Sequence, residues 1–296
     1  MDRKQFLKTL ALLPLAASAM KLSELSKITA PFNNTDKMPV LFLGHGSPMN
    51  AIEENEFVGG FRNIGKEIPK PNAILCVSAH WETKGTFVTA MENPKTIHDF
   101  GGFPKALYDV QYPAHGSPEL AKTTKALVKS TEIDLDEKWG LDHGSWSVIK
   151  HLYPDADVPV IQMSLDYYKS AQYHYDLAKE LKSLREKGVL IIGSGNMVHN
   201  LGMVAWDRLS DADYGYHWAL EARDKMNNFI LNDDHKSLIN FKSQGRVFEL
   251  AIPTPEHFLP LLYTLAMKDE NEKVTLFNDK AIAGSLTMTS VKIETI

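Results

Sequence analysis

The sequence predicts an α/β protein, a single domain with a mostly parallel central sheet flanked by helices. Four continuous apolar runs indicate the strands, at residues 39–46, 73–80, 158–166 and 189–196. They lack the polar alternation of a strand with one wet face, as expected of parallel strands covered on both sides. Stretches with apolar residues at helical spacing lie between them, at 117–130, 170–187 and 216–232. No internal repeat or second linker interrupts this pattern, which favours one domain.

Composition narrows the functional class. The chain has 296 residues, of which 44% are hydrophobic and 23% charged, as in an ordinary globular protein. A net charge of −5 offers no basic surface for nucleic acid, and no window reaches the roughly 18 apolar residues of a membrane span. A single cysteine, Cys76, excludes an internal disulfide and a cysteine zinc cluster, whereas 11 histidines suffice for a nitrogen-ligated metal. We therefore expect small-molecule chemistry, with no nucleic-acid partner and no stable membrane span.

The first residues have the layout of a secretory signal. A basic start precedes an apolar run from Leu10 to Ala19, and the run ends in small residues. The stretch from Arg3 to Lys8 resembles a twin-arginine signal with lysine in place of the second arginine. We predict a signal peptide over residues 1–19, of twin-arginine or another type, and export to the periplasm. The alternative is an amphipathic helix on a cytoplasmic protein.

The segment after the predicted signal is polar and contains proline and asparagine. Such a segment cannot bury enough apolar surface to fold by itself. We predict a linker over residues 20–38 and a catalytic domain over residues 39–296.

Three of the predicted strands deliver a histidine to the same edge of the sheet. His45 follows the first run, His80 ends the second, and His199 lies a few residues past the fourth. In open α/β sheets, ligands bind in the crevice outside the carboxyl ends of the strands. Glycine, serine or proline flanks these histidines and allows a close backbone approach. We therefore expect the three side chains to share one site.

Two further histidines are candidates for this site. Pro255 is a plausible first helical residue, which would place His257 in the first turn of a helix whose positive end faces the crevice. His143 lies in a predicted loop that leads into a helix.

The surroundings of the site suggest substrate contacts. His98 lies beside Phe100 in an aromatic stretch that could wall a pocket, and Ser47 follows His45 closely. We predict substrate-binding roles for His98, Phe100 and Ser47. The other histidines lie in polar helical or loop stretches and are interpreted as structural or surface residues: His115, His151, His174, His217 and His235.

Six motifs, in this order along the chain, resemble the 4,5-DOPA extradiol dioxygenase family of the class III extradiol ring-cleaving dioxygenases. They are GHGSPMN, SAHWET, IHDFGGFPKALYDVQYPAHGSPELA, LDHGSWSVI, GSGNMVHNLG and TPEHFLPLLY. The resemblance implies an α/β fold, metal ligands at His45, His80 and His257, and an acid/base histidine at His199. In some bacterial relatives the metal is described as zinc, with the residue matching His199 as a fourth ligand. The predicted signal departs from the family, which is associated with cytosolic enzymes.

These residues predict a metal-dependent extradiol dioxygenase that opens the ring of a catechol such as DOPA with O2. The product would be a muconic semialdehyde. Three histidines would leave coordination positions on Zn²⁺ or Fe²⁺ open for catechol and dioxygen. His199 would exchange a proton with the substrate, and His143 would hydrogen-bond bound oxygen or substrate. Glu256, the only nearby carboxylate, is expected to point about 100° away from His257.

Two alternatives belong to other classes. A zinc-dependent hydrolase could use the same three histidines with an activated water, and metal identity would discriminate the two. A non-catalytic metal-binding member of the superfamily would keep the fold and part of the site. Serine catalysis through Ser47 or Ser194 ranks lower, because neither lies in a G-x-S-x-G elbow.

Overall fold

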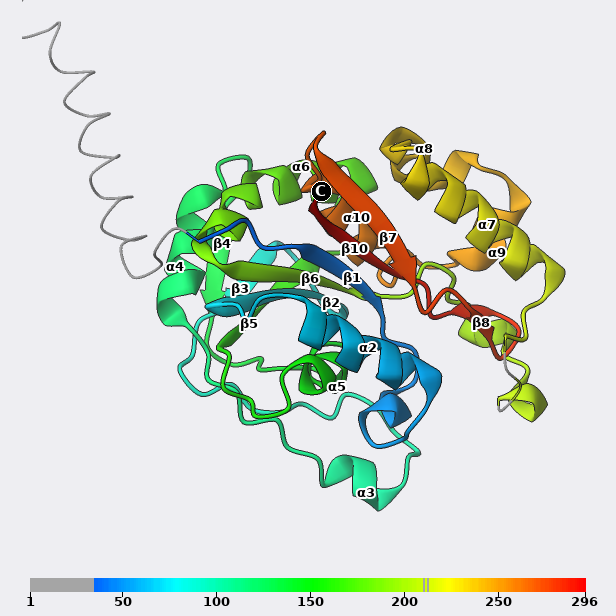
Figure 1. Cartoon of the computed structure of the whole chain (residues 1–296), viewed down its shortest axis with the longest axis horizontal. Helices are drawn as coiled ribbons and strands as arrows, with labels where there is room; N and C mark the ends of the chain where they lie inside the picture. The colour runs from blue at the N-terminus through cyan, green and yellow to red at the C-terminus, as the bar shows by residue number, and fades with distance from the viewer. Residues whose placement is uncertain (1–34, 210, 212) are drawn as a thin grey trace, which may run out of the picture.

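A computed structural model describes residues 35–209, 211 and 213–296. The predicted signal peptide and residues 20–34 of the predicted linker lie outside the described residues. The described chain is built on an eight-stranded sheet with the order β4-β3-β5-β2-β6-β1-β10-β7 (Figure 1). Helices cover both faces of this sheet, so the predicted fold class is confirmed.

The four predicted strands form the centre of the sheet. They are β1 (Val40–Gly44), β2 (Ala73–Thr83), β5 (Val160–Asp166) and β6 (Val189–Gly195). All run parallel, in the order β5-β2-β6-β1. Val40 and Phe42 of β1 point into one core cluster, and Leu41 and Leu43 point into the other. Burial on both faces explains why these runs carry no polar alternation.

Shorter strands extend the sheet on both sides. They are β3 (Thr86–Thr89), β4 (Ile133–Asp136), β7 (Glu272–Phe277) and β10 (Ser290–Thr295). β10 is antiparallel to both β1 and β7, while β3 is antiparallel to β5 and parallel to β4. A separate pair, β8 (Ala281–Ile282) and β9 (Leu286–Thr287), lies beyond the main sheet.

The helices form two layers (Figure 1). One layer contains α2 (Glu56–Glu67), α3 (Lys105–Tyr108) and α5 (His143–Leu152), and its core includes Cys76. The other contains α4 (Pro118–Leu127), α6 (Ala171–Glu180), α7 (His217–Leu231), α8 (His235–Ile239), α9 (Arg246–Ala251) and α10 (Leu259–Ala266). Short 3-10 turns are η1 (Pro48–Ala51), η2 (Lys182–Lys187), η3 (Leu201–Met203), η4 (Trp206–Arg208) and η5 (Phe241–Ser243). Among the described residues, no helix is both long and apolar enough to cross a membrane.

A buried ion pair between Arg185 and Glu272 lies at the end of the sheet where β1 and β6 begin. Arg185 donates to the carbonyl oxygens of Met38 and Met267, both at 2.7 Å. Its guanidinium also donates to both carboxylate oxygens of Glu272, at 2.9 and 2.5 Å, and Lys37 lies 3.0 Å from the same carboxylate. We call Arg185, Glu272 and Lys37 the Arg185 cluster. Met38 is only 3% exposed, so the described end of the predicted linker packs against the domain.

Candidate active site

Two of the histidines come from β1 and β2, the two strands that flank β6. His45 follows β1, and its N–H extends the ladder to the carbonyl of Gly195 at 3.1 Å. His80 lies inside β2, which continues to Thr83, so the prediction that the strand ends at His80 is wrong. The pairing of β2 with β5 shifts register between Val77 and Glu82. Such an irregularity redirects side chains, and it allows a strand residue to face the site.

His257 lies in a turn before α10, which begins at Leu259, so the predicted helix start at Pro255 is wrong. Leu259 does donate its N–H to the carbonyl of Pro255, at 2.9 Å. The carbonyl of His257, however, accepts the N–H of Asn196 at 2.9 Å, and the N–H of Leu261, which would reach it in a helix, bonds to the carbonyl of Phe258 at 3.1 Å instead. A Cβ on Gly195 would come within 2.1 Å of this carbonyl oxygen, which explains the glycine at the end of β6.

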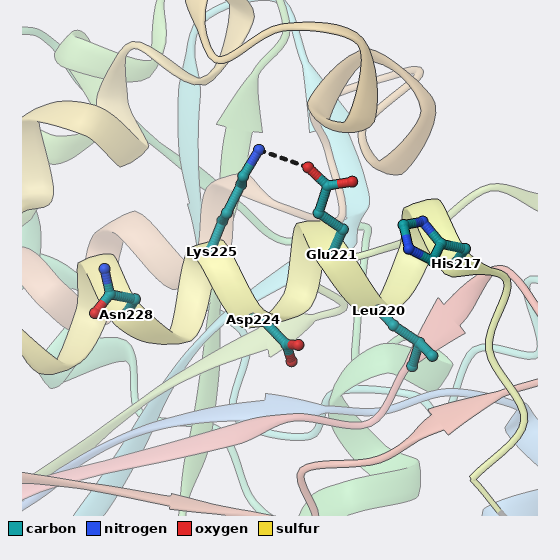
Figure 2. A pocket seen from close by; sticks show the side chains of 6 residues that line it. All are labelled: His217, Leu220, Glu221, Asp224, Lys225 and Asn228. Atoms are coloured by element: carbon teal, nitrogen blue, oxygen red, sulfur yellow. Dashed lines mark hydrogen bonds and ion pairs between the residues drawn. The ribbon is translucent and has the colours of Figure 1, made fainter.

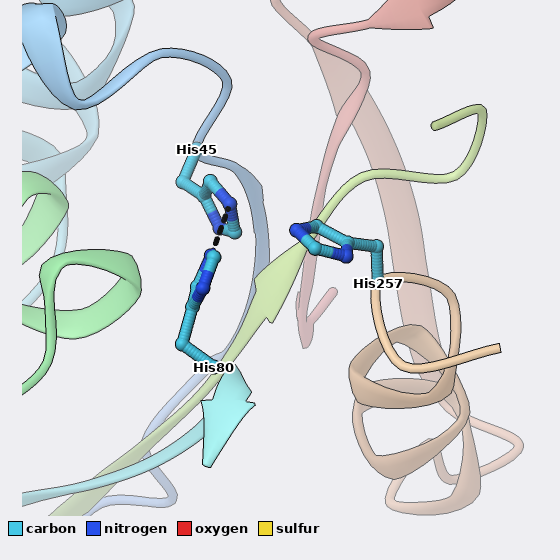
Figure 3. A group of neighbouring side chains, drawn as sticks. All are labelled: His45, His80 and His257. Atoms are coloured by element: carbon cyan, nitrogen blue, oxygen red, sulfur yellow. Dashed lines mark hydrogen bonds between the residues drawn. The ribbon is translucent and has the colours of Figure 1, made fainter. Parts of the chain in front are cut away.

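The side chains of His45, His80 and His257 converge (Figure 3). One ring nitrogen from each lies within 4.8 Å of the others, and the Nε2 atoms of His45 and His80 are 3.2 Å apart. His45 is 2% exposed and His257 is 8% exposed, so the group is largely shielded from water. The tertiary fold therefore brings together the three residues predicted as metal ligands.

Hydrogen bonding determines the tautomer of His45. Its Nδ1 lies 3.0 Å from the hydroxyl oxygen of Ser194. Ser194 has a single hydroxyl proton, which it donates to the carbonyl of Gly144. His45 must therefore donate from Nδ1, which leaves a lone pair on Nε2.

Carboxylates determine the tautomers of the other two rings in the same way. Nδ1 of His80 lies 3.3 Å from Oδ2 of Asp99, and Nδ1 of His257 lies 3.1 Å from Oε1 of Glu256. An ionised carboxylate only accepts hydrogen bonds, so Nδ1 of His257 donates and its Nε2 keeps its lone pair. The carboxylate of Asp99 beside Nδ1 of His80 favours the same tautomer for that ring. All three histidines thus present the free nitrogen that a metal ion requires, with the other nitrogen held by a protein oxygen.

Glu256 does not point away from the site, so that prediction is wrong. Its carboxylate and the ring nitrogens of His199 and His257 lie within 4.8 Å of one another. Burial raises the pKa of Glu256, but hydrogen bonds from His257 and Thr254 outweigh this and lower it to about 2. The ionised carboxylate acts here as the acceptor for His257.

The histidines are neutral at physiological pH. Burial, followed by the neighbouring imidazoles, lowers the pKa of His45 and His80 well below its usual value. Burial also lowers the pKa of His257, against the opposing effect of Glu256. Neutral imidazole is the form that binds metals, and three such donors suit Zn²⁺ or Fe²⁺.

Two further histidines border this group. The ring of His199 stacks on that of His257, with centroids 3.5 Å apart and planes at 8°. His143 is the first residue of α5 rather than a loop residue, because Asp142 caps the helix. Asp99 accepts hydrogen bonds from Nδ1 of His143 at 3.0 Å and from its backbone N–H at 2.9 Å. We call His45, His80, His143, His199 and His257 the histidine group.

The predicted substrate residues have different surroundings. Phe100 lies edge-on to His143, with ring centroids 5.4 Å apart. His98 is 5.7 Å from Phe100, and its Nε2 lies 3.0 Å from the carbonyl of Val110. Ser47 is exposed and caps η1. Phe100 therefore borders the histidine group directly, and the substrate roles of all three stay predictions.

Sequence reasoning missed the anchoring residues of the site. Asp99 lies between His98 and Phe100, the two residues predicted to contact substrate. A single aspartate in a loop belongs to no periodic pattern, so its sequence context does not indicate a role. The sequence suggests Ser194 only as a candidate nucleophile and Glu256 only as a candidate metal ligand. The pairing of each with a particular imidazole depends on contacts between distant segments.

The remaining histidines have ordinary roles. His151 contacts the carbonyl of Asn50 at 2.7 Å, and His174 contacts the hydroxyl of Tyr263 at 3.0 Å. His217 lies on the outer face of α7, beside a shallow hollow in which Lys225 pairs with Glu221 at 2.7 Å (Figure 2). That hollow is lined by side chains of this one helix and is an exposed helix face rather than a second site. Its other lining residues are Leu220, Asp224 and Asn228.

The fold and the site together define a class: an α/β protein with neutral histidines converging at the carboxyl ends of parallel strands, suited to a divalent metal. A family model described as the catalytic LigB subunit of aromatic ring-opening dioxygenase matches residues 39–288. The chain belongs to this LigB family and is an extradiol aromatic ring-opening dioxygenase. The family implies a metal, and the three-histidine group provides a place for it.

Individual relatives agree with this assignment. The chain is 45% identical over 265 residues to a protein of Escherichia coli (strain K12) named 4,5-DOPA dioxygenase extradiol, covering 88% of this chain and 96% of that one. A protein of the same name from Beta vulgaris is 35% identical over 257 residues, covering 85% and 94%. A crystal structure of an uncharacterized Escherichia coli K12 protein superposes with a TM-score of 0.75 at 41% identity, covering 87% of this chain and all of that one.

Proposed function

We propose that this enzyme opens the ring of a catechol such as DOPA with O2 and gives a muconic semialdehyde. Both oxygen atoms enter the product, so no further reductant is needed. The observation that carries the proposal is the convergence of three imidazoles, each with Nδ1 within 3.3 Å of a protein oxygen. The names of the relatives, 4,5-DOPA dioxygenase extradiol, favour this chemistry over hydrolysis.

His45, His80 and His257 would hold the metal, Zn²⁺ or Fe²⁺, through Nε2. When bound, the ion would supply positive charge that favours the anionic catecholate and would leave positions open for substrate and dioxygen. The protein supplies three neutral ligands already in the correct tautomer. Shielding from water strengthens each of these interactions.

His199 would accept the proton of a catechol hydroxyl at a ring nitrogen and return it during ring opening. Burial, followed by the neighbouring His257, lowers its pKa to about 3, so the ring is neutral at physiological pH but only a weak base. The nearby charge of Glu256 would stabilise the imidazolium once it forms. His143 would hydrogen-bond the substrate, and Phe100, His98 and Ser47 would line its binding site.

The test is metal analysis of protein purified without oxygen, followed by reaction with L-DOPA and O2. We expect bound metal, consumption of O2 and DOPA in equal amounts, and a new absorption band from the ring-opened product. A matched pair of variants, His257→Ala and the exposed His115→Ala, should differ completely in both measurements. Metal-loaded wild-type protein that leaves DOPA and other catechols unchanged would contradict the proposal.

We also propose that residues 1–19 direct export to the periplasm and are removed there. The basic start, apolar run and small-residue end support this. Mass measurement of the protein isolated from its natural host would show a mature chain that begins near Met20. An active cytoplasmic protein that retains Met1 would exclude export by this signal.

A further inference from the structure

We propose that Asp99 is a positioning residue that fixes two histidines of different function at once: His80, a metal ligand, and His143, a substrate contact. The inference rests on the proposed function and deepens it. Asp99 lies in the loop before α3, far in sequence from the α5 residue that it contacts.

The contacts of Asp99 are specific to the two rings. Its Oδ2 lies 3.0 Å from Nδ1 of His143 and 3.3 Å from Nδ1 of His80. Its Oδ1 accepts the backbone N–H of His143 at 2.9 Å. One carboxylate thus accepts two hydrogen bonds from His143 and places its charge beside Nδ1 of His80, and the centroids of the two rings are only 3.9 Å apart.

This geometry dictates what His143 can do. Because Asp99 accepts from Nδ1, the tautomer of His143 that this contact selects has its lone pair on Nε2. His143 can therefore accept a hydrogen bond from a catechol hydroxyl, but in this tautomer it cannot donate one to a bound oxygen. The negative charge of Asp99 would also offset the positive charge of a metal held by His80, at the point closest to His143.

The backbone around this contact leaves little freedom. A Cβ on Gly144 would lie 2.5 Å from the hydroxyl of Ser78 and 2.7 Å from a ring carbon of His80. Asp142, which caps α5, accepts the hydroxyl of Ser78 at 2.7 Å. The start of α5 is therefore held against β2. Asp99 contacts the Nδ1 atoms of both His80 and His143.

The experiment compares Asp99→Asn with Asp109→Asn in the full chain. Asp109 is an exposed partner of Lys105 on the neighbouring helix α3. An asparagine at position 99 keeps the size, but its amide nitrogen only donates, so it cannot accept both from Nδ1 of His143 and from the backbone N–H of His143. We expect the Kd for Zn²⁺, measured by competition with a chromophoric chelator, to rise about 10–100-fold, the usual effect of losing such a partner. Asp109→Asn should keep the wild-type Kd.

A double-mutant cycle tests the link to His143. If Asp99 acts on catalysis through His143, the fall in kcat that Asp99→Asn causes at saturating metal should largely disappear in a His143→Gln background. Asp99→Glu, which retains the charge, should recover part of the zinc affinity. If Asp99→Asn does not fold, Asp99→Ser provides the same comparison, since the carboxylate side chain is 17% exposed and water can replace it.

Unchanged zinc affinity in Asp99→Asn, or a kcat penalty undiminished by His143→Gln, would overturn the role of Asp99. Zinc binding and DOPA ring opening by the wild type and by Asp109→Asn distinguish failure of the Asp99 inference from failure of the proposed function. If they bind zinc and open the DOPA ring, only the Asp99 inference is at stake. If they do neither, the proposed function fails first.

Discussion

The two ends of the central strands treat buried polar groups in opposite ways. At the amino ends, the Arg185 cluster joins charges of opposite sign, and the guanidinium is satisfied by two carbonyls and a carboxylate. At the carboxyl ends, the histidine group places five imidazoles together, and their mutual effect opposes protonation. The first arrangement is complete within the protein, whereas the second offers three lone pairs to a cation.

This difference indicates that the Arg185 cluster contributes to the stability of the fold, whereas the histidine group provides the groups for metal binding. In the Arg185 cluster, the charges of Arg185 and Glu272 neutralise each other and their hydrogen-bonding groups are already paired, so they do not bind a ligand. His45 and His257 are hydrogen-bonded through Nδ1, and Nδ1 of His80 lies beside Asp99, so the Nε2 atoms of these three rings stay available. Disturbing the Arg185 cluster should therefore reduce stability and leave metal binding intact, and disturbing the histidine group should do the reverse.

The largest effect should come from removing a ligand. His45→Ala deletes one of three proposed donors, so metal content should fall from about one ion per chain to almost none, and activity should be lost with it. The measurement is metal analysis beside the rate of DOPA cleavage, with exposed His115→Ala as control. Full metal content in His45→Ala would mean that the wrong histidines have been chosen.

His199→Gln should separate catalysis from metal binding. If His199 is an acid/base group, metal content should persist while kcat falls about 10²–10⁴-fold. Metal analysis and steady-state kinetics on the same preparation provide both values. Loss of metal as complete as in His45→Ala would make His199 a fourth ligand and the site a closed, four-coordinate one.

Glu272→Gln should disrupt the Arg185 cluster and reduce the stability of the fold. The variant leaves the buried guanidinium of Arg185 without its counter-charge, which should cost about 3–5 kcal/mol of unfolding free energy. Urea denaturation would measure this loss, with exposed Glu270→Gln as the control. The zinc Kd of the folded variant should match the wild type, and a raised Kd would show that the two ends are coupled.

The smallest effect concerns His174, a buried histidine outside both groups. Burial lowers its pKa to about 4, below the unfolded value of 6.5, so the unfolded chain binds more protons between these pH values. Its contribution to stability is therefore lost as pH falls through this window, by about 2 kcal/mol between pH 7 and pH 5. Urea denaturation of His174→Gln at both pH values should show a correspondingly weaker pH dependence, whereas exposed His217→Gln should behave as wild type.

Local sequence was enough for the framework of the fold. The four parallel strands coincide with the four apolar runs, because burial on both faces demands continuous apolar residues. Element ends were harder to predict. The start of α10 lies past His257, whose carbonyl accepts the N–H of Asn196, the residue after β6, and no local pattern reports that contact.

The sequence by itself determined which residue types are available at the carboxyl edge of the sheet: histidines placed within or shortly after apolar runs, as at His45, His80 and His199. Strand direction alone carries them to one edge, because parallel strands share their carboxyl ends. Only the tertiary structure decided how each ring is oriented and which nitrogen is free. Ser194, Asp99 and Glu256 make that choice, through hydrogen bonds that depend on ångström-scale distances between segments. Neither propensity nor spacing encodes such distances, since they arise only when the separate strands and loops pack together.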